Sequence, residues 1–173
     1  MSPNPAARPV ATPPDFTSQE FRAALGQFAT GVTIVTTRDA QGHAVGLTAN
    51  SFNSVSLEPP LVLWSLSRRS NSLPAFTAGT HFCINVLTAE QRPLAERFAS
   101  KALDRFDGVP WFDGASGTPV IADAAAVFEC FHHSHHDAGD HVIFIGQVER
   151  CSRRLGAQPL LFVGGRLVAD LRL

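Results

Sequence analysis

Hydrophobic and polar positions along the chain first follow a helical period and then a period of two. The helical spacing covers 17–30 and predicts an amphipathic helix. Thr17 and Glu20 have the spacing of a capping box at its start, and Gly31 is expected to end it. The apolar face of this helix contains Phe21, Leu25 and Phe28.

Alternating and β-branched runs then predict strands at 32–37, 43–50, 61–67, 81–87, 126–134, 141–150, 160–163 and 166–171. Turns are expected at 39–42, at 137–140 and at Gly164-Gly165. Strands joined mainly by tight turns favour an antiparallel barrel with flanking helices over a parallel α/β sheet.

Two further helices are expected between strands. The first covers 71–78 and is interrupted near Pro74, and the second covers 89–99, opened by a capping box of Thr88 and Gln91. Residues 100–119 are predicted to form a long loop. Loops of that length are uncommon unless they have a function.

Length and composition indicate one folded domain. The chain has 173 residues, of which 45% are hydrophobic and 17% charged, so a packed core is expected over 16–173. Residues 1–15 are rich in Pro and Ala and are expected to be a disordered tail without a secretory signal. No apolar run approaches the roughly 18 residues that cross a bilayer. We therefore expect a cytoplasmic protein with no membrane partner.

Charge and cysteine usage narrow the possible chemistry. The formal net charge is -1 and the basic residues are scattered, so a nucleic-acid partner is not expected. Cys83, Cys130 and Cys151 are odd in number and lack a C-x-x-C spacing, which is not typical of a disulfide framework or a zinc site. We expect three buried, reduced thiols.

Histidines cluster at 132–136, in the run His-His-Ser-His-His. Imidazole is a good zinc or copper ligand, but adjacent side chains on a strand point to opposite faces. At most two or three of these histidines then share a side, with no carboxylate or thiolate at a suitable interval. We predict no metal site; solvated or structural roles, or a place for one histidine near the active site, remain open.

Two polar clusters interrupt the apolar pattern. In 46–60, hydroxyl and amide side chains occupy both faces of a strand, which suits either a structural turn or a polar ligand. In 67–72, two arginines and several hydroxyls precede a predicted helix, which suits either an ordinary cap or a phosphate site. Neither cluster has the glycine spacing of a P-loop or of a classical dinucleotide-binding turn.

Four segments resemble the flavin reductase domain family, the short reductase components of two-component monooxygenases. They are FRAALGQFATGVTIVTT at 21–37, GLTANSFNSVSLEPPLVLWSLS at 46–67, AERFAS at 95–100 and GDHVIFIGQVE at 139–149. The resemblance covers about 16–170. It implies a mainly β fold, the FMN-binding split antiparallel barrel of Greek-key type, assembled as a homodimer with flavin near the subunit interface.

The resemblance also implies cofactor contacts at particular residues. The flavin would bind at 48–54 and 65–72, with its ring and ribityl chain against 48–51 and its phosphate end against 65–67 and 70–72. The stretch that closes over the cofactor matches 98–99. The turn at 139–141 would place His141, held by Asp140, beside the nicotinamide or flavin ring as the catalytic positioning residue. The implied binding residues are Thr48, Ala49, Asn50, Ser51, Ser54, Ser65, Leu66, Ser67, Ser70, Asn71, Ser72, Phe98, Ala99, Gly139, Asp140 and His141.

By this resemblance the chain is expected to use NADH, with NADPH as an alternative, to reduce FAD or FMN for a separate oxygenase acting on an aromatic compound. The chain departs from the family by having no Tyr near its C-terminal strands, which leaves 163–166 as a weaker nicotinamide contact. Two alternatives stay open. One is a flavoprotein that keeps its flavin and reduces another small molecule, and the other is a flavin-binding module without redox turnover.

Overall fold

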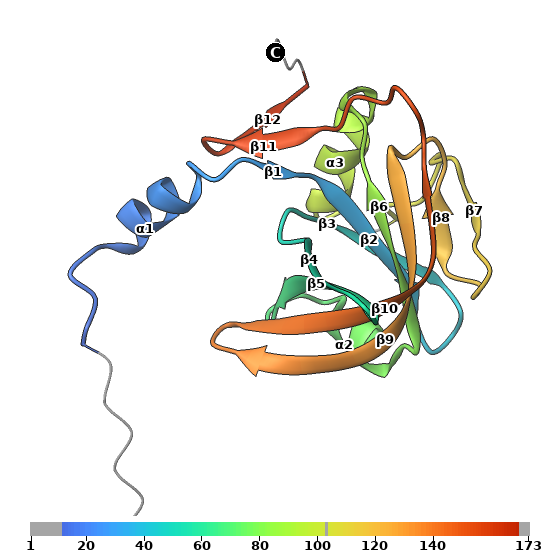
Figure 1. Ribbon diagram of the computed structural model, residues 1–173, viewed down its shortest axis with the longest axis horizontal. Coiled ribbons are helices and arrows are strands. Elements are labelled where there is room, and N and C mark those ends of the chain that lie inside the picture. Colours follow the sequence, from blue (N-terminus) through green and yellow to red (C-terminus); the bar gives the residue numbers. More distant parts are fainter. Residues whose placement is uncertain (1–11, 103, 170–173) are drawn as a thin grey trace, which may run out of the picture.

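The computed structural model describes residues 12–102 and 104–169, and strands dominate it (Figure 1). The helices are α1 (Ser18–Leu25), α2 (Leu73–Ala78) and α3 (Arg92–Ala99), the last preceded by a 3-10 turn at Ala89–Gln91. The strands are β1 (Thr30–Gly31), β2 (Thr33–Arg38), β3 (Ala44–Ala49), β4 (Asn53–Leu57), β5 (Pro60–Ser67), β6 (His81–Val86), β7 (Trp111–Asp113), β8 (Pro119–Ile121), β9 (Ala126–Ala138), β10 (His141–Arg153), β11 (Leu161–Val163) and β12 (Arg166–Val168).

The main sheet has seven strands in the order β3-β2-β6-β9-β10-β5-β4, and every neighbouring pair is antiparallel. Its two end strands, β3 and β4, are consecutive in the chain and separated only by residues 50–52. The sheet must therefore curl until its ends meet. No ladder joins β3 to β4 in the part of the chain that is described, so the curled sheet stays split at this point. The predicted mainly β, split-barrel fold is confirmed.

Two hydrophobic clusters fill the molecule. The first lies inside the curled sheet and contains Trp64, which stacks on Phe144 with ring centroids 4.9 Å apart. The second lies under α3 and contains the fully buried Phe98 and Leu160. Aromatic pairs of this kind add about 1 kcal/mol beyond the area they bury.

The cysteines are placed differently from one another. Cys83 and Cys130 are buried as expected, and burial raises the pKa of Cys83 and raises that of Cys130 to about 12, so both stay protonated. Cys151 is exposed, so the expectation that it is buried was wrong. The ladder between β10 and β5 ends at Gln147, which leaves the later part of β10 with a neighbour on one side only.

Helix α1 begins as the sequence predicts but ends earlier, and it lies on the surface. Its capping box is present, but the helix ends at Leu25 with Gly26 as its C-cap, and Gly31 instead belongs to β1. Its apolar face does not reach the core, because no residue of α1 is buried. Figure 1 shows α1 on an arm that leaves the body of the protein. Periodicity identified the apolar face but could not show what covers it.

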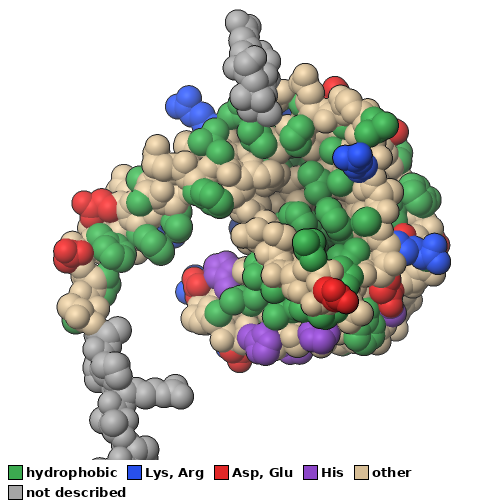
Figure 2. Space-filling view, in the orientation of Figure 1, with side chains coloured by type: hydrophobic (Ala, Val, Ile, Leu, Met, Phe, Trp, Pro, Cys, Tyr) green, Lys and Arg blue, Asp and Glu red, His purple; other side chains and the backbone are tan. Residues whose placement is uncertain are grey.

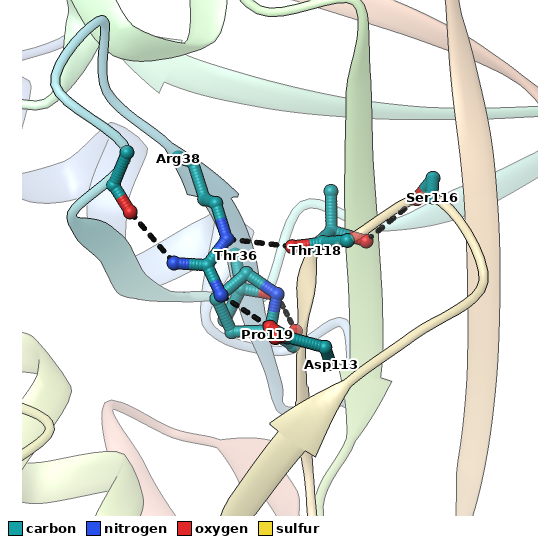
Figure 3. Close-up of polar contacts among 8 residues, drawn as sticks. Thr36, Arg38, Asp113, Ser116, Thr118 and Pro119 are labelled. Atoms are coloured by element: carbon teal, nitrogen blue, oxygen red, sulfur yellow. Dashed lines mark hydrogen bonds and ion pairs between the residues drawn. The ribbon is translucent and has the colours of Figure 1, made fainter.

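The predicted long loop at 100–119 contains a short hairpin of β7 and β8, and Arg38 fastens it to the main sheet (Figure 3). The Arg38 side chain donates from Nε to the Gly117 carbonyl and from Nη1 to the Gly42 carbonyl, both at 2.6 Å. It also pairs with Asp113 and lies over the Trp111 ring, 5.6 Å from its centroid. One guanidinium therefore ties the β2–β3 turn to the hairpin.

Other elements differ from expectation mainly at their ends. Pro74 lies in the first turn of α2 and does not interrupt it, since proline is tolerated there. β9 and β10 run several residues beyond 134 and 150, and Gly164 and Gly165 have the positive φ of the predicted turn. Residues 1–11 of the predicted tail and 170–171 of the last predicted strand lie outside the described residues. The described helices are all too short to span a membrane.

Candidate functional site

A half-exposed sheet surface lies where β10 pairs with β5. In β5 the buried positions Val62, Trp64 and Leu66 alternate with half-exposed ones, and β10 shows the same alternation. Because directly paired residues share a face, the half-exposed positions form one surface. We call this surface the β5–β10 face: Leu61, Leu63, Ser65, Ser67, His141, Ile143, Ile145 and Gln147. It combines an apolar centre with hydroxyl, amide and imidazole groups.

Ser51, in the connection between β3 and β4, is hydrogen-bonded to β5 beside this face. Its hydroxyl accepts from the Ser65 backbone N–H at 2.9 Å and donates to the Ser65 carbonyl at 3.2 Å. The predicted ring-binding segment is therefore held against β5 by its own serine. Asn50 and Ser54, on either side of this contact, are exposed.

The turn between β9 and β10 brings His141 to the same face. His141 pairs directly with Ser67, and Gly139 has the positive φ that the turn requires. The His141 Nδ1 donates to Asp140 Oδ1 at 2.7 Å. This hydrogen bond and the charge of His141 lower the pKa of Asp140, so the carboxylate stays ionised well into the acidic range. The Nε2 atom of His141 is left free to contact a ligand.

Arg68 braces the turn from the neighbouring strand. Its backbone N–H donates to the Asp140 carbonyl at 2.9 Å, and its guanidinium pairs with Asp137 at 2.7 Å. The two segments predicted separately from the sequence, 65–72 and 139–141, are thus in contact.

A second feature is a cavity of about 690 Å³ between β3, α2 and residues 101–102 and 104–106. Its volume lies within the range of about 300–1,000 Å³ that is typical of small-molecule sites. We call it the β3–α2 cavity, and its polar and charged lining is Asp39, Asn71, Ser72, Lys101, Asp104 and Arg105. Two of these, Asn71 and Ser72, were predicted from the sequence as phosphate contacts.

Arg105 shapes one wall of this cavity. It donates to the Gly46 carbonyl at 2.9 Å and, through Nη2, to the Ser100 carbonyl at 2.7 Å. It therefore fixes the loop against β3 while placing a permanent positive charge at the cavity.

Two chain segments connect the face to the cavity. Consecutive turns lead from Ser67 at the face to Ser72 at the cavity, with Ser70 N–H donating to the Ser67 carbonyl at 2.9 Å. Strand β3 runs from Gly46 at the cavity towards Ser51 beside the face. An elongated ligand with an aromatic ring at one end and an anionic group at the other would fit both features.

Some predicted residues have side chains that are already engaged. The Thr48 hydroxyl donates to the Ala95 carbonyl at 2.7 Å, and the side chains of Ala49 and Leu66 lie in the core. The Phe98 ring is also in the core, where it meets the Phe106 ring edge-on at 5.0 Å. The Phe98 ring is thus buried, whereas Lys101 and Ala102, which follow this stretch, line the cavity. That 98–99 closes over a cofactor stays a prediction.

The remaining predicted residues divide between surface and turn. Ala99 is exposed, and the Ser70 hydroxyl accepts from the Ser72 N–H at 3.2 Å. The weaker candidates at 163–166 lie in the turn between β11 and β12, at the base of the α1 arm, where Gly164 N–H donates to the Gly26 carbonyl at 2.7 Å.

Sequence analysis missed Lys101 and Arg105. Neither residue belongs to a recognisable sequence motif. The length of the predicted loop in which they lie was the one sign that this segment has a function. Only the folded chain shows that this loop returns to β3.

Comparison with known proteins gives a consistent result. The model of the family described as "Flavin reductase like domain" matches residues 25–169. Over 148 residues the chain is 49% identical to FMN reductase (NADH) SmoA of Agrobacterium fabrum, covering 86% of this chain and 83% of the relative. It is 42% identical to HsaB of Rhodococcus jostii, the reductase subunit of a flavin-dependent monooxygenase, covering 86% of this chain and 75% of the relative.

A solved structure with a similar fold carries ligand fragments. The NADH:FAD oxidoreductase SgcE6 of Streptomyces globisporus, in complex with NAD and FAD fragments, superposes with a TM-score of 0.84 at 40% identity. The match covers 89% of this chain and 93% of that one.

Proposed function

Because the chain belongs to the flavin reductase like domain family, we propose that it is an NADH-dependent reductase of FMN or FAD. The observation that carries the assignment of the site is the junction of 65–72 with 139–141, which joins an apolar, hydroxyl-lined face to a charged cavity. Bound flavin would supply the ring that accepts hydride, so the protein needs no nucleophile of its own.

The β5–β10 face suits the ring end of a flavin. Ile143 and Ile145 provide a flat apolar surface, and Ser65 and Ser67 provide polar groups beside it. Ser51 is hydrogen-bonded to Ser65 at this face, and the neighbouring Asn50 is exposed. An aromatic ring system with polar edges needs such a mixture.

The β3–α2 cavity suits the phosphate end. Lys101 and Arg105 supply cations, and Asn71 and Ser72 supply neutral hydrogen-bonding groups. The two carboxylates of the lining, Asp39 and Asp104, each accept from two backbone N–H groups of their own turns. Both FMN and FAD have a phosphate at this position, and riboflavin has none. The cavity therefore explains a preference for FMN or FAD over riboflavin, but it does not distinguish FMN from FAD.

His141 is the residue that we propose to position the nicotinamide. Asp140 fixes the proton on Nδ1 and holds the ring in place, which leaves Nε2 to contact the substrate. The protein's contribution to hydride transfer is then orientation of two rings and exclusion of competing geometries.

We further propose a homodimer, in which a second copy covers α1. Phe21, Leu25 and Phe28 are 50%, 57% and 72% exposed on this arm. Figure 2 shows apolar side chains along α1 on the side that borders the hollow between the arm and the β9–β10 hairpin. An eight-residue helix is not stable alone in water, so it needs a packing partner. The hollow also lies beside the tip that carries His141.

The reductase is proposed to supply reduced flavin to a separate oxygenase; the relative HsaB is named as the reductase subunit of a flavin-dependent monooxygenase. The substrate of that oxygenase would be an aromatic compound. We propose that the reductase works in the cytoplasm, because reducing conditions there keep its three cysteines as free thiols.

The function is tested by NADH oxidation without flavin and then with riboflavin, FMN or FAD. A flavin reductase consumes NADH only when flavin is added. Turnover of another acceptor without added flavin would instead favour a permanently held cofactor. Unchanged NADH with every flavin, in folded protein, would leave only a binding module.

A further inference from the structure

A bulge in β9 changes the direction of the histidines at 132–136. His132 pairs with Gly146 and Ser134 pairs with Ile145, so His133 has no residue opposite it. After this extra residue, His135 pairs with Phe144. Gly146 and Phe144 are both buried positions of β10, so His132 and His135 lie on the same face although they are three residues apart. Strict alternation, assumed from the sequence, does not hold here.

The two imidazoles are in direct contact. Nε2 of His132 lies 3.1 Å from Nδ1 of His135, and the ring centroids are 5.1 Å apart. Both rings pack against Phe144, with centroid distances of 5.5 and 5.7 Å. The contact is therefore supported by the aromatic core beneath it.

The tautomer of His132 is set by the backbone. Its Nδ1 lies 2.9 Å from the Gly79 carbonyl, which can only accept, so Nδ1 carries the proton. The lone pair of Nε2 is then directed towards His135. A backbone carbonyl that fixes the far nitrogen of a histidine in this way is the usual support of a metal-ligating imidazole.

We propose that His132 Nε2 and His135 Nδ1 form a binding site for one divalent transition-metal ion of the zinc and copper class. Zn–N bonds of about 2.0–2.1 Å in tetrahedral geometry place two ligating nitrogens about 3.3 Å apart, close to the observed separation. On binding, His135 moves its proton from Nδ1 to Nε2, so the pair loses no net proton.

Two nitrogen ligands favour zinc or copper over magnesium or calcium, which prefer oxygen. Within residues 12–102 and 104–169, no group of three or more His, Cys, Asp or Glu side chains is arranged to hold a metal. Water therefore completes the coordination, and the ion stays accessible at the exposed His135. His132 and His135 lie on the opposite face of the sheet from the β5–β10 face. Metal binding there does not depend on flavin reduction.

The test uses the full chain without an affinity tag, in a Cys151→Ser background, because the exposed thiol of Cys151 would also bind these ions. Zinc chloride is titrated by calorimetry into this protein and into three variants. His135→Gln removes a proposed ligand that is exposed, so folding is preserved. His133→Gln and His136→Gln are the matched controls, since they remove a histidine of the same run without touching the pair.

We expect one zinc ion per chain, an affinity that falls about tenfold or more in His135→Gln, and little change in the two controls. With copper, the electron paramagnetic resonance spectrum should show two coupled nitrogens in the parent and one in His135→Gln. Equal weakening in all three variants, absence of saturable zinc binding, or a copper spectrum unaffected by His135→Gln would each overturn the proposal.

Discussion

Single charged residues mark the two ends of the proposed site, and each can be tested apart from the fold. Lys101 is exposed at the cavity, whereas Asp140 is exposed at the hairpin tip. Neither side chain supports the core. Their removal should therefore report on ligand contacts and not on folding.

Lys101→Ala is expected to raise the KM for FMN about tenfold while leaving the KM for riboflavin unchanged, because only FMN has a phosphate to pair with the ammonium group. Steady-state NADH oxidation at varied flavin measures both values. Arg92→Ala is the control: it removes the same charge from the opposite end of α3. Equal increases for FMN and riboflavin would exclude a phosphate site at Lys101.

Asp140→Ala is expected to lower kcat/KM for NADH roughly tenfold, because the His141 ring loses the group that orients it. Asp140→Asn, which can still accept from Nδ1, should recover much of the loss. Asp137→Ala serves as the control, since it breaks the ion pair to Arg68 in the same turn. If Asp137→Ala lowers kcat/KM for NADH as much as Asp140→Ala does, the loss reflects general disruption of the turn and not the orientation of His141.

The pH dependence of this contact has a definite sign. The folded-state pKa of Asp140 is lowered, so its stabilising hydrogen bond is complete above the unfolded pKa and is lost as pH falls through the lowered value. The Asp140-dependent part of activity should therefore persist through mildly acidic pH.

At the scale of elements, Arg38 should hold the β7–β8 hairpin through carbonyl contacts more than through its ion pair. Arg38→Met is expected to lower the free energy of unfolding by about 2 kcal/mol, as charged hydrogen bonds to two carbonyls are lost. Asp113→Ala, which removes only the partner that is 60% exposed, should cost less than about 1 kcal/mol. Urea denaturation measures both, and equal costs would contradict this division.

The α1 arm is expected to carry the dimer contact. The double substitution of Phe21 and Phe28 by Ser should raise the dimer dissociation constant roughly hundredfold or more, since each buried Phe contributes about 1.5–3 kcal/mol. Light scattering during size-exclusion chromatography over a dilution series measures this. Arg22→Ser on the same helix is the control. A monomeric parent protein, or a variant that stays dimeric at every dilution, would contradict the assignment.

At the scale of the whole molecule, local pattern predicted the elements well. Alternation found most strands of the main sheet but missed β4 and the short strands β1, β7 and β8. Hydroxyl spacing found the capping boxes of Thr17 and Thr88. What failed depended on long-range packing. The first helix was expected to reach residue 30 but ends at Leu25, and Cys151 was expected to be buried but is exposed. A local pattern does not identify the surface against which a residue packs.

The candidate site shows the same division. Resemblance identified 65–72 and 139–141, but only the register shows that His141 faces Ser67. Lys101 and Arg105 could be assigned to the cavity only from the folded structure, in which their loop packs against β3. The bulge at His133 places His132 and His135 on the same face, which strict alternation does not predict. Backbone irregularities of this kind leave little trace in residue order.

The most direct test of the central claim is the stoichiometry of anaerobic NADH oxidation with FMN in large excess over protein. A reductase that releases its product should convert the whole flavin pool, one FMN reduced for each NADH consumed, at a rate proportional to enzyme. Reduction that stops at one flavin per chain would contradict release to a separate oxygenase, and absence of reduction would contradict the reductase assignment itself.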